Sequence, residues 1–269
     1  MAEDDMNEAS ERLSGALMWG LPLRTIRTSL DSADGDEVGS GKIFSPTSSA
    51  ALAINAFAPF LDRPEALPPL PGTEDLGWPA RAVRIEAVLP FPWQGGRRPN
   101  MDVLIETQGG LIGIESKRYE PFDAQGAPSW SDAYWRPVWG NAMDRHQILR
   151  DRSRAGDAGF RYLDEAQLLK HALGLLTATA RMSTTGTCAP CLLHLRAEPS
   201  SDRRGRKLAA ETQDAVAAEV VRFAEAVAGD HVRFVGLTYR RLIEGWRAAP
   251  LPQLRAHAAA LLAFFDNDL

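Results

Sequence analysis

Two short apolar runs separated by a glycine pair form the clearest hydrophobic pattern in the chain. The runs cover residues 102–107 and 111–118, and Gly109-Gly110 lies between them. Apolar runs of this length on either side of a glycine pair are typical of two strands joined by a tight β-hairpin. We therefore predict that both runs lie side by side in one sheet.

Charged side chains stand at the ends of both runs of this hairpin. Asp102 begins the first run, and Glu115-Ser116-Lys117 closes the second. Because successive side chains of a strand point to opposite faces, Glu115 and Lys117 should share one face while Ser116 points to the other. If the strands pair as the turn suggests, Asp102 lies near that shared face as well.

The rest of the pattern alternates between helical and strand-like segments. We expect helices over 7–19, 50–60 (capped by Thr47 or Ser48), around 140–150, 164–182 (capped by Asp164), 207–228 (ended by Gly229) and 254–265, and strands over 82–89, 190–197 and 231–239. Residues 31–41, 64–79, 90–99 and 121–162 are expected to be loops or irregular segments. From residue 47 onward, this order predicts an α/β fold with a mixed central sheet flanked by helices. We expect one continuous domain, in which residues 1–80 form a helical segment and connector packed on a core of residues 81–269.

Composition and length describe an ordinary globular chain. Its 269 residues are 45% hydrophobic and 24% charged, which is typical of soluble domains. No apolar run approaches the roughly 20 residues that a membrane span needs, and three of the first five residues are acidic, unlike a secretory signal. We therefore expect a cytoplasmic protein without a membrane segment, and its two cysteines exclude a disulfide framework.

Charge is unevenly distributed along the chain, whose net charge is −5. Residues 1–80 hold 5 basic and 13 acidic side chains, whereas the remainder holds 25 basic and 22 acidic side chains. Six arginines lie within residues 136–161, and residues 203–207 form a compact basic cluster. Both could be solvated surface, or they could be a rim that contacts phosphates around an acidic metal site.

The hairpin residues have the chemistry of a magnesium site. Mg²⁺ prefers a few carboxylates together with waters and phosphate oxygens, and Asp102 and Glu115 supply the carboxylates, with the backbone carbonyl of Ser116 beside them. An ion held there can bind a scissile phosphate and activate a water molecule. Lys117 should stay protonated near two carboxylates, and it can orient the nucleophile and stabilise charge on phosphorus.

This arrangement resembles the PD-(D/E)xK nuclease superfamily, which has the restriction-endonuclease-like fold. Asp102 and Glu115-Ser116-Lys117 match its motif, although Pro99-Asn100-Met101-Asp102 departs from a proline directly before the aspartate. Within the superfamily, residues 100–102 and 115–121 look similar to a bacterial group of uncharacterised restriction-endonuclease-like proteins. The segment Ser48–Asn55 also looks similar to the N-terminal helix of that group. The resemblance is strong over about 47–60 and 84–121, with weaker support to about 176.

The resemblance implies a nuclease that uses Mg²⁺ or Mn²⁺ to hydrolyse phosphodiester bonds, with DNA as the expected substrate. Asp102 and Glu115 would bind the metal together with the Ser116 carbonyl, and Lys117 would assist catalysis. A homodimer would be expected if both strands of a duplex are cut.

Two further residues are candidates for the same site. Glu86 stands among apolar residues of the strand before Asp102, as either a solvent-facing residue or a third acidic ligand such as the superfamily often has. Gln167 shares a helix face with Lys170 and His171, where related nucleases often carry a glutamine and basic residues. Gln167 could instead serve a capping box with Asp164.

Structural roles are expected for several other residues. Glu120 is expected to support the site or to contact Arg118, and the tryptophans at positions 130, 135 and 139 could stack on bases, although packing is expected for at least two. Cys188 and Cys191 lack the second ligand pair that a zinc site needs. The glycine-and-lysine run ending at Lys42 lacks the P-loop spacing.

Two other classes of function stay open at this point. A nuclease-fold module could bind nucleic acid or a protein partner without cutting, which would suit the acidic overall balance. An enzyme acting on a small phosphorylated or nucleotide substrate would be favoured by a narrow closed pocket, whereas an open cleft would favour nucleic acid.

Overall fold

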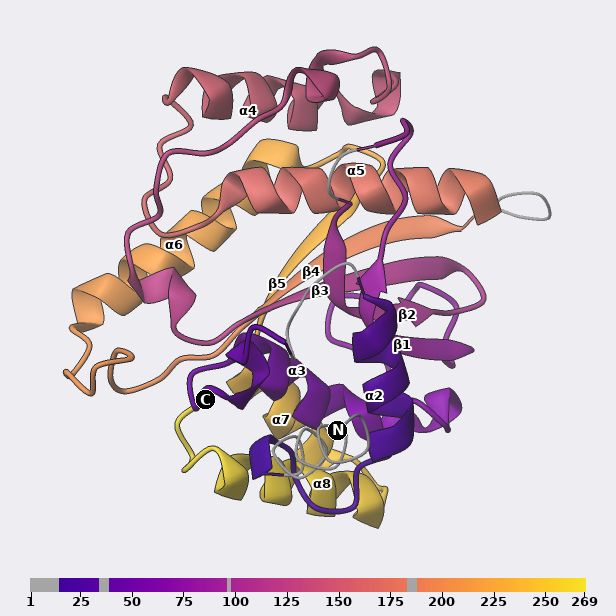
Figure 1. Ribbon diagram of the computed structural model, residues 1–269, viewed down its shortest axis with the longest axis vertical. Coiled ribbons are helices and arrows are strands. Elements are labelled where there is room, and N and C mark those ends of the chain that lie inside the picture. Colours follow the sequence, from indigo (N-terminus) through magenta and orange to yellow (C-terminus); the bar gives the residue numbers. More distant parts are fainter. Residues whose placement is uncertain (1–14, 34–38, 96–97, 183–187) are drawn as a thin grey trace, which may run out of the picture.

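A five-stranded mixed sheet forms the centre of the protein (Figure 1). Its strands are β1 (Ala82–Val88), β2 (Asn100–Glu106), β3 (Gly110–Lys117), β4 (Ala189–Arg196) and β5 (Arg233–Thr238), and they lie in this order across the sheet. The first three strands pair antiparallel, whereas β3, β4 and β5 pair parallel. The sequence prediction of an α/β fold with a mixed sheet is therefore confirmed.

The computed structural model describes residues 15–33, 39–95, 98–182 and 188–269. The helix expected over 7–19 lies for the most part outside these residues. Among the described helices, we find none whose length and apolar character would let it span a membrane.

Most of the expected helices are present. They are α3 (Ser49–Phe57), α4 (Asp144–Ala155), α5 (Glu165–Met182), α6 (Ala210–Val227) and α8 (Pro252–Phe264). Ser48 caps α3 by accepting a hydrogen bond from the Ala51 N–H at 3.1 Å. Three of the expected starting points were wrong by two to four residues, because α4 begins at Asp144, α6 at Ala210 and α8 at Pro252 instead of at about 140, 207 and 254.

Two helices of the structure were not predicted from the sequence. Helix α2 (Leu23–Ser32) includes two residues of the predicted 31–41 loop, and α7 (Tyr239–Ala248) directly follows β5. Thr238 caps α7 by accepting from the Arg241 N–H at 3.2 Å, so the chain passes from strand to helix without a loop. The buried residues of α7 are Tyr239, Leu242, Ile243 and Trp246, which is the spacing of a helix face.

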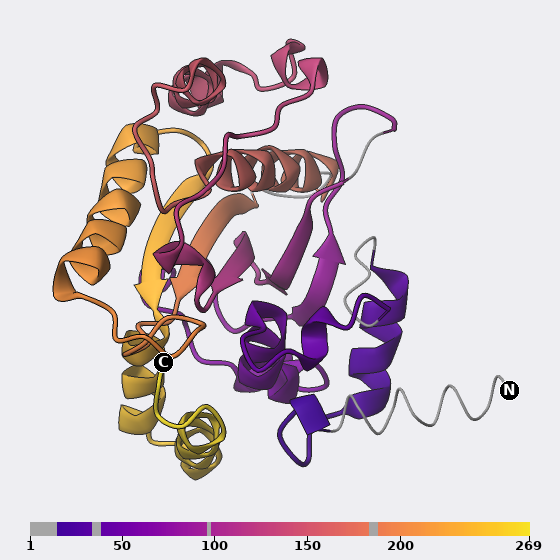
Figure 2. The ribbon, with the colours of Figure 1, turned by 60° about the vertical axis from the view of Figure 1, so that its left-hand side comes forward.

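Helices cover both faces of the sheet (Figures 1 and 2). On one face, α5 and α6 pack on apolar side chains such as Leu111 and Leu192, and α4 lies outside them. On the opposite face, α3, α7 and α8 pack on residues such as Ile112, Ile114 and Leu193, and α2 packs against β1 and α3. The two cores thus follow the alternation of side chains along each strand.

The hairpin turn between β2 and β3 is clamped by the segment before β1. The N–H groups of Gln108 and Gly109 donate to the carbonyls of Gly77 and Leu76, at 3.0 and 3.3 Å. A Cβ atom on Gly77 would lie 2.6 Å from the backbone nitrogen of Gly109, and Gly77 has a φ of +72°. Glycine is therefore required at position 77 both for its conformation and for the close approach of the two backbones.

Replacing Gly77 by alanine should lower the melting temperature more than the matched change Gly156→Ala. Gly156 has a similar φ of +77° at the end of α4, but a Cβ atom there would meet nothing within 4 Å. Both changes cost about 1 kcal/mol for the left-handed conformation, and Gly77→Ala adds roughly 1–3 kcal/mol for the overlap with Gly109. Thermal denaturation of both variants measures the difference, and equal melting temperatures would contradict this account of the turn.

Candidate active site

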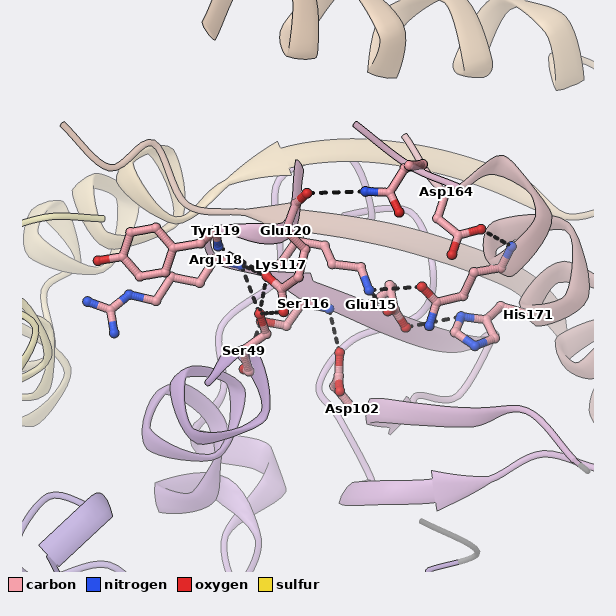
Figure 3. Close-up of polar contacts among 12 residues, drawn as sticks. Ser49, Asp102, Glu115, Ser116, Lys117, Arg118, Tyr119, Glu120, Asp164 and His171 are labelled. Atoms are coloured by element: carbon pink, nitrogen blue, oxygen red, sulfur yellow. Dashed lines mark hydrogen bonds and ion pairs between the residues drawn. The ribbon is translucent and has the colours of Figure 1, made fainter. Parts of the chain in front are cut away.

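Strand β3 presents its charged residues to the face of the sheet that α5 covers. Ile112 and Ile114 belong to the core on the α3 side, so the alternating residues Glu115 and Lys117 point toward α5. Lys117 Nζ lies 2.6 Å from Glu115 Oε1 (Figure 3). Ser116 points to the other face, where its hydroxyl lies 2.8 Å from the Tyr239 hydroxyl. The alternation predicted for these three residues is confirmed.

Asp102 lies where β2 and β3 separate. The last paired residues of the two strands are Val103 and Ile114. Beyond them, the Ser116 N–H donates to Asp102 Oδ2 at 2.6 Å (Figure 3). The aspartate carboxylate thus takes the hydrogen bond at the point where the strand ladder ends, and it lies beside Glu115.

The Glu115 carboxylate is buried between two cationic or potentially cationic groups. Its Oε1 contacts Lys117 Nζ, and its Oε2 lies 3.1 Å from Nδ1 of the buried His171 of α5 (Figure 3). Burial opposes ionisation, but the charges of Lys117 and His171 outweigh it and lower the pKa of Glu115 to about 2. Glu115 is therefore ionised at neutral pH.

The first turn of α5 holds Lys117 from the opposite side. Gln167 Oε1 accepts a hydrogen bond from Lys117 Nζ at 2.8 Å. The Gln167 backbone N–H donates to Asp164 Oδ1 at 2.9 Å, so the prediction that Asp164 caps this helix is confirmed. Because the glutamine side chain reaches Lys117, it joins the predicted site.

Asp102 and Lys117 have pKa values that are both raised, with opposite consequences for their charge. Burial raises the pKa of Asp102 well above its usual value, and the neighbouring charges of Glu115 and Glu86 add to this effect. For Lys117, burial would lower the pKa, but the negative charges of Glu115 and Asp102 outweigh it and raise the pKa. The lysine stays charged, while the aspartate is crowded by negative charge that a cation would relieve.

Glu120 fixes the chain just after the motif to α3. Its carboxylate accepts from the Ser49 hydroxyl at 2.6 Å and from the backbone N–H groups of Arg118 and Tyr119 at 3.0 Å (Figure 3). The Ser49 hydroxyl oxygen also accepts from the Arg118 N–H at 2.9 Å. Glu120 therefore supports the end of β3, as expected from the sequence.

A cavity of about 470 Å³ opens over these residues. Asp102, Glu115, Ser116, Lys117 and Gln167 all line it. The rest of its wall comes from Glu120, from the start of α3 and the residues before it, and from two cationic side chains, as follows: Lys42, Ser45, Thr47, Ser48, Ser49, Ala50 and Arg203. The carboxylates thus lie at the base of a cavity that cations and hydroxyl groups border.

A comparison with protein-family models identifies the family. The model described as Restriction Endonuclease associating with ARP matches residues 16–263. The chain belongs to this family. The match covers the hairpin and the helices on both faces of the sheet, so the resemblance to restriction endonucleases drawn from the sequence is confirmed. No curated protein and no solved structure matches the chain.

Glu86 lies close to the candidate active site but does not line the cavity over it. The pairs Ile85–Val103 and Ala87–Met101 on either side place Glu86 across from Asp102 in the register. Glu86 has a φ of +50°, is buried, and accepts a hydrogen bond from the Asn100 side chain. It borders a different cavity, next to α2 and the end of α5. Its role as a third acidic residue stays a prediction.

The donors at the site suit a magnesium ion that water and phosphate also coordinate. Within the described ranges, no group of three or more His, Cys, Asp or Glu side chains is arranged to hold a metal ion. Mg²⁺ does not need such a group, since it commonly uses one or two carboxylates together with waters and substrate phosphates. Asp102 and Glu115 line one cavity, so they fit such an ion, and the Ser116 carbonyl stays a predicted ligand.

The other candidates have structural partners. Lys170 donates to the Ser129 carbonyl at 2.7 Å and lies over the ring of Trp130. Trp139 is buried and donates to the Tyr134 carbonyl, and Trp130 and Trp135 pack on each other. Packing was expected for at least two of these tryptophans, and this is confirmed. Cys188 and Cys191 are free cysteines.

Four residues of the site were not predicted from the sequence in their observed roles. Ser49 anchors Glu120, His171 contacts Glu115, and Lys42 and Arg203 border the cavity. Arg203 belongs to the basic cluster that the charge pattern had indicated, whereas no arginine from residues 136–161 lines this cavity. A signal for Ser49 was present in the serine pair at 48–49, since only one of two adjacent hydroxyl groups can cap the helix.

Proposed function

We propose that the protein is a metal-dependent nuclease that hydrolyses phosphodiester bonds, with DNA as its substrate and Mg²⁺ or Mn²⁺ as its cofactor. Membership in a restriction-endonuclease family supports nuclease chemistry. The observation that carries the proposal is the convergence of Asp102, Glu115 and Lys117 in one cavity whose border includes Lys42 and Arg203. Negative charge at the base and positive charge at the border suit a phosphate bound through a cation.

Each of these residues has a chemical role in the proposed reaction. Asp102 and Glu115 hold the divalent ion, with the Ser116 carbonyl as a further ligand. When bound, such an ion supplies Lewis acidity to the scissile phosphate and lowers the pKa of a water nucleophile. Lys117 Nζ orients that nucleophile and stabilises the negative charge that develops on the phosphate oxygens. Gln167 holds the lysine in place through its hydrogen bond of 2.8 Å.

A nuclease-fold module that binds without cutting is the second candidate. One observation favours it: both oxygens of Glu115 already have partners, Lys117 and His171. A metal ion must compete with these contacts for the carboxylate. Metal-dependent cleavage is therefore the property that separates the two candidates.

The family description also supports a protein partner. It names restriction endonucleases that associate with ARP, and we extend this association to the present chain. A homodimer is the simplest assembly for cutting both strands of a duplex, since a two-fold axis places one centre on each strand.

Incubation of the purified protein with end-labelled single-stranded and double-stranded DNA tests the proposed function. We expect cleavage products with Mg²⁺ or Mn²⁺ and none with a chelator. RNA and free nucleotides serve as parallel substrates, and hydrolysis of nucleotides alone would favour an enzyme of small phosphorylated compounds. Binding of DNA without any cleavage, under all metal conditions, would contradict the proposal and favour the binding module.

A further inference from the structure

A second and larger cavity, of about 700 Å³, lies beside the candidate site. Gln167 lines both cavities, and its side chain accepts the hydrogen bond from Lys117. His171, which lies 3.1 Å from Glu115 Oε2, also lines the larger cavity. The two cavities therefore adjoin at the start of α5, where Gln167 lines both.

Aromatic rings form one wall of the larger cavity. Phe91 and Trp93 stack with their centroids 4.7 Å apart, and the Tyr134 ring meets the Trp93 ring edge-on at 5.2 Å. All three residues line the cavity. They come from the loop before β2 and from the short helix η5 (Asp132–Trp135), which α4 and α5 support. Phe91 and Tyr134 are buried whereas Trp93 is half-buried, so Trp93 supplies the ring on which the flat face of a nucleobase can stack.

Hydrogen-bonding groups line the same cavity. Asp164, Glu165 and Gln167 at the start of α5 line the cavity, together with Gln125 and Ser129. Carboxylate and amide oxygens accept hydrogen bonds from the exocyclic amino groups and ring N–H groups of bases. Arg98 and Lys170 line the cavity as well and balance the charges of Asp164 and Glu165, so the aromatic rings, and not the net charge, favour a base as the occupant.

We propose that this cavity receives one unpaired nucleobase of the substrate while the adjoining phosphodiester lies over Lys117. The inference rests on the proposed nuclease function and names its substrate class, which is nucleic acid with a base outside the double-helical stack next to the scissile bond. A single strand, a bulge or an extruded base meets this condition. Extruding a base from an intact duplex costs a few kcal/mol, so a base that is already unpaired binds at lower cost.

Binding of three fluorescein-labelled DNA duplexes tests the proposal, in a chelating buffer that prevents cleavage. One duplex has a single-nucleotide bulge, the second has an abasic bulge at the same place, and the third is fully paired. Stacking of one base on aromatic side chains predicts about tenfold tighter binding of the base-containing bulge than of the abasic bulge. Fluorescence anisotropy gives the dissociation constants.

Two tryptophan variants provide the matched comparison. Trp93 lines the cavity, whereas Trp135 belongs to the same aromatic cluster, is likewise half-buried, and does not line it. Trp93→Ala should abolish the tenfold preference for the base, and Trp135→Ala should retain it. Trp93→Phe should restore most of the preference, since a smaller ring can still stack.

The results separate the inference from the proposed function. Equal affinity of the wild-type protein for the base-containing and abasic bulges overturns the inference without need of any variant, even if cleavage with Mg²⁺ is observed. A preference that depends on Trp93, in a protein that cuts none of the substrates, supports the base cavity and contradicts the nuclease. A preference that survives Trp93→Ala places the base elsewhere and overturns the inference.

Discussion

Replacing Lys117 by methionine is expected to lower the rate of DNA cleavage by about 100- to 1,000-fold, the usual cost of removing one charge-stabilising group from an active site. Methionine keeps the length of the side chain and removes its charge. Lys117 stays protonated because Glu115 and Asp102 outweigh the effect of burial on its pKa. The loss should appear in the rate at saturating substrate, measured on end-labelled DNA in Mg²⁺.

Two controls accompany this variant. Lys207→Met makes the same change at an exposed position of the basic cluster that does not line the cavity, and its cleavage rate at saturating substrate should equal that of the wild type. Lys117→Arg keeps a cation beside Glu115 for stability, but the forked guanidinium does not reproduce a compact ammonium group, so its rate should also fall. A Lys117→Arg protein that cuts at the wild-type rate would contradict a specific role for the lysine.

The second large effect concerns Asp102, whose replacement by asparagine should stabilise the metal-free protein while abolishing cleavage. In chelator at pH 8, we expect the melting temperature of Asp102→Asn to exceed that of the wild type by a few degrees, on the order of 2–4 °C for each kcal/mol. Asparagine can still accept the hydrogen bond from the Ser116 N–H, and it removes a carboxylate that Glu115 and Glu86 repel.

The direction of this effect is set by proton linkage. The pKa of Asp102 is raised in the folded protein above its ordinary value of 3.8, so the folded state holds the proton more tightly than the unfolded chain. The ionised aspartate therefore destabilises the folded protein above about pH 4, increasingly up to its folded pKa. Below pH 4 the aspartate is protonated in both states, and the advantage of Asp102→Asn should disappear.

Magnesium should reverse the order of stability. Metal that binds the folded wild-type protein raises its melting temperature in proportion to the logarithm of metal concentration, whereas Asp102→Asn should show no such rise. Thermal denaturation at pH 4 and pH 8, with Mg²⁺ and with chelator, covers the four conditions. A wild-type melting temperature that is indifferent to Mg²⁺ would contradict Asp102 as a metal ligand.

The local parts of the fold and of the site could be predicted from the sequence. The hairpin, the shared face of Glu115 and Lys117 and the cap at Asp164 all depend on residues close together in the chain. Strand alternation and helix capping act over two to four residues, so the sequence carries their full signal. The contact of the Gln167 side chain could be decided only from the structure, because the sequence allowed both a local role in a capping box with Asp164 and a role in the site.

Contacts between distant segments could not be predicted in the same way. Ser49 lies 71 residues before Glu120, and the Ser49 hydroxyl donates to its carboxylate. Lys42 and Arg203 reach the same cavity from segments with no shared pattern. Tertiary packing alone brings these residues together, and no periodic pattern in the sequence predicts it.

Helix α7 was missed for a different reason. Its buried residues have a helical spacing, but β5 ends at Thr238 and the helix begins at Tyr239. The strand pattern therefore extends into the helix by one apolar residue, and Gly245 interrupts the helical pattern further along. No turn residue separates the two elements, so the sequence does not indicate where the two-residue period of the strand changes to the period of a helix.

The hydrogen bond between Asp102 and the Ser116 N–H has an evolutionary consequence. Because this carboxylate satisfies a backbone group where β2 and β3 part, a relative without the proposed nuclease activity would still be selected to keep an acceptor there. The buried Glu115–Lys117 pair satisfies no backbone group, and its partners His171 and Gln167 are side chains that can change with it, so apolar residues can replace this ion pair without loss of stability. Inactive branches of the family would then retain the aspartate and exchange the other two residues together.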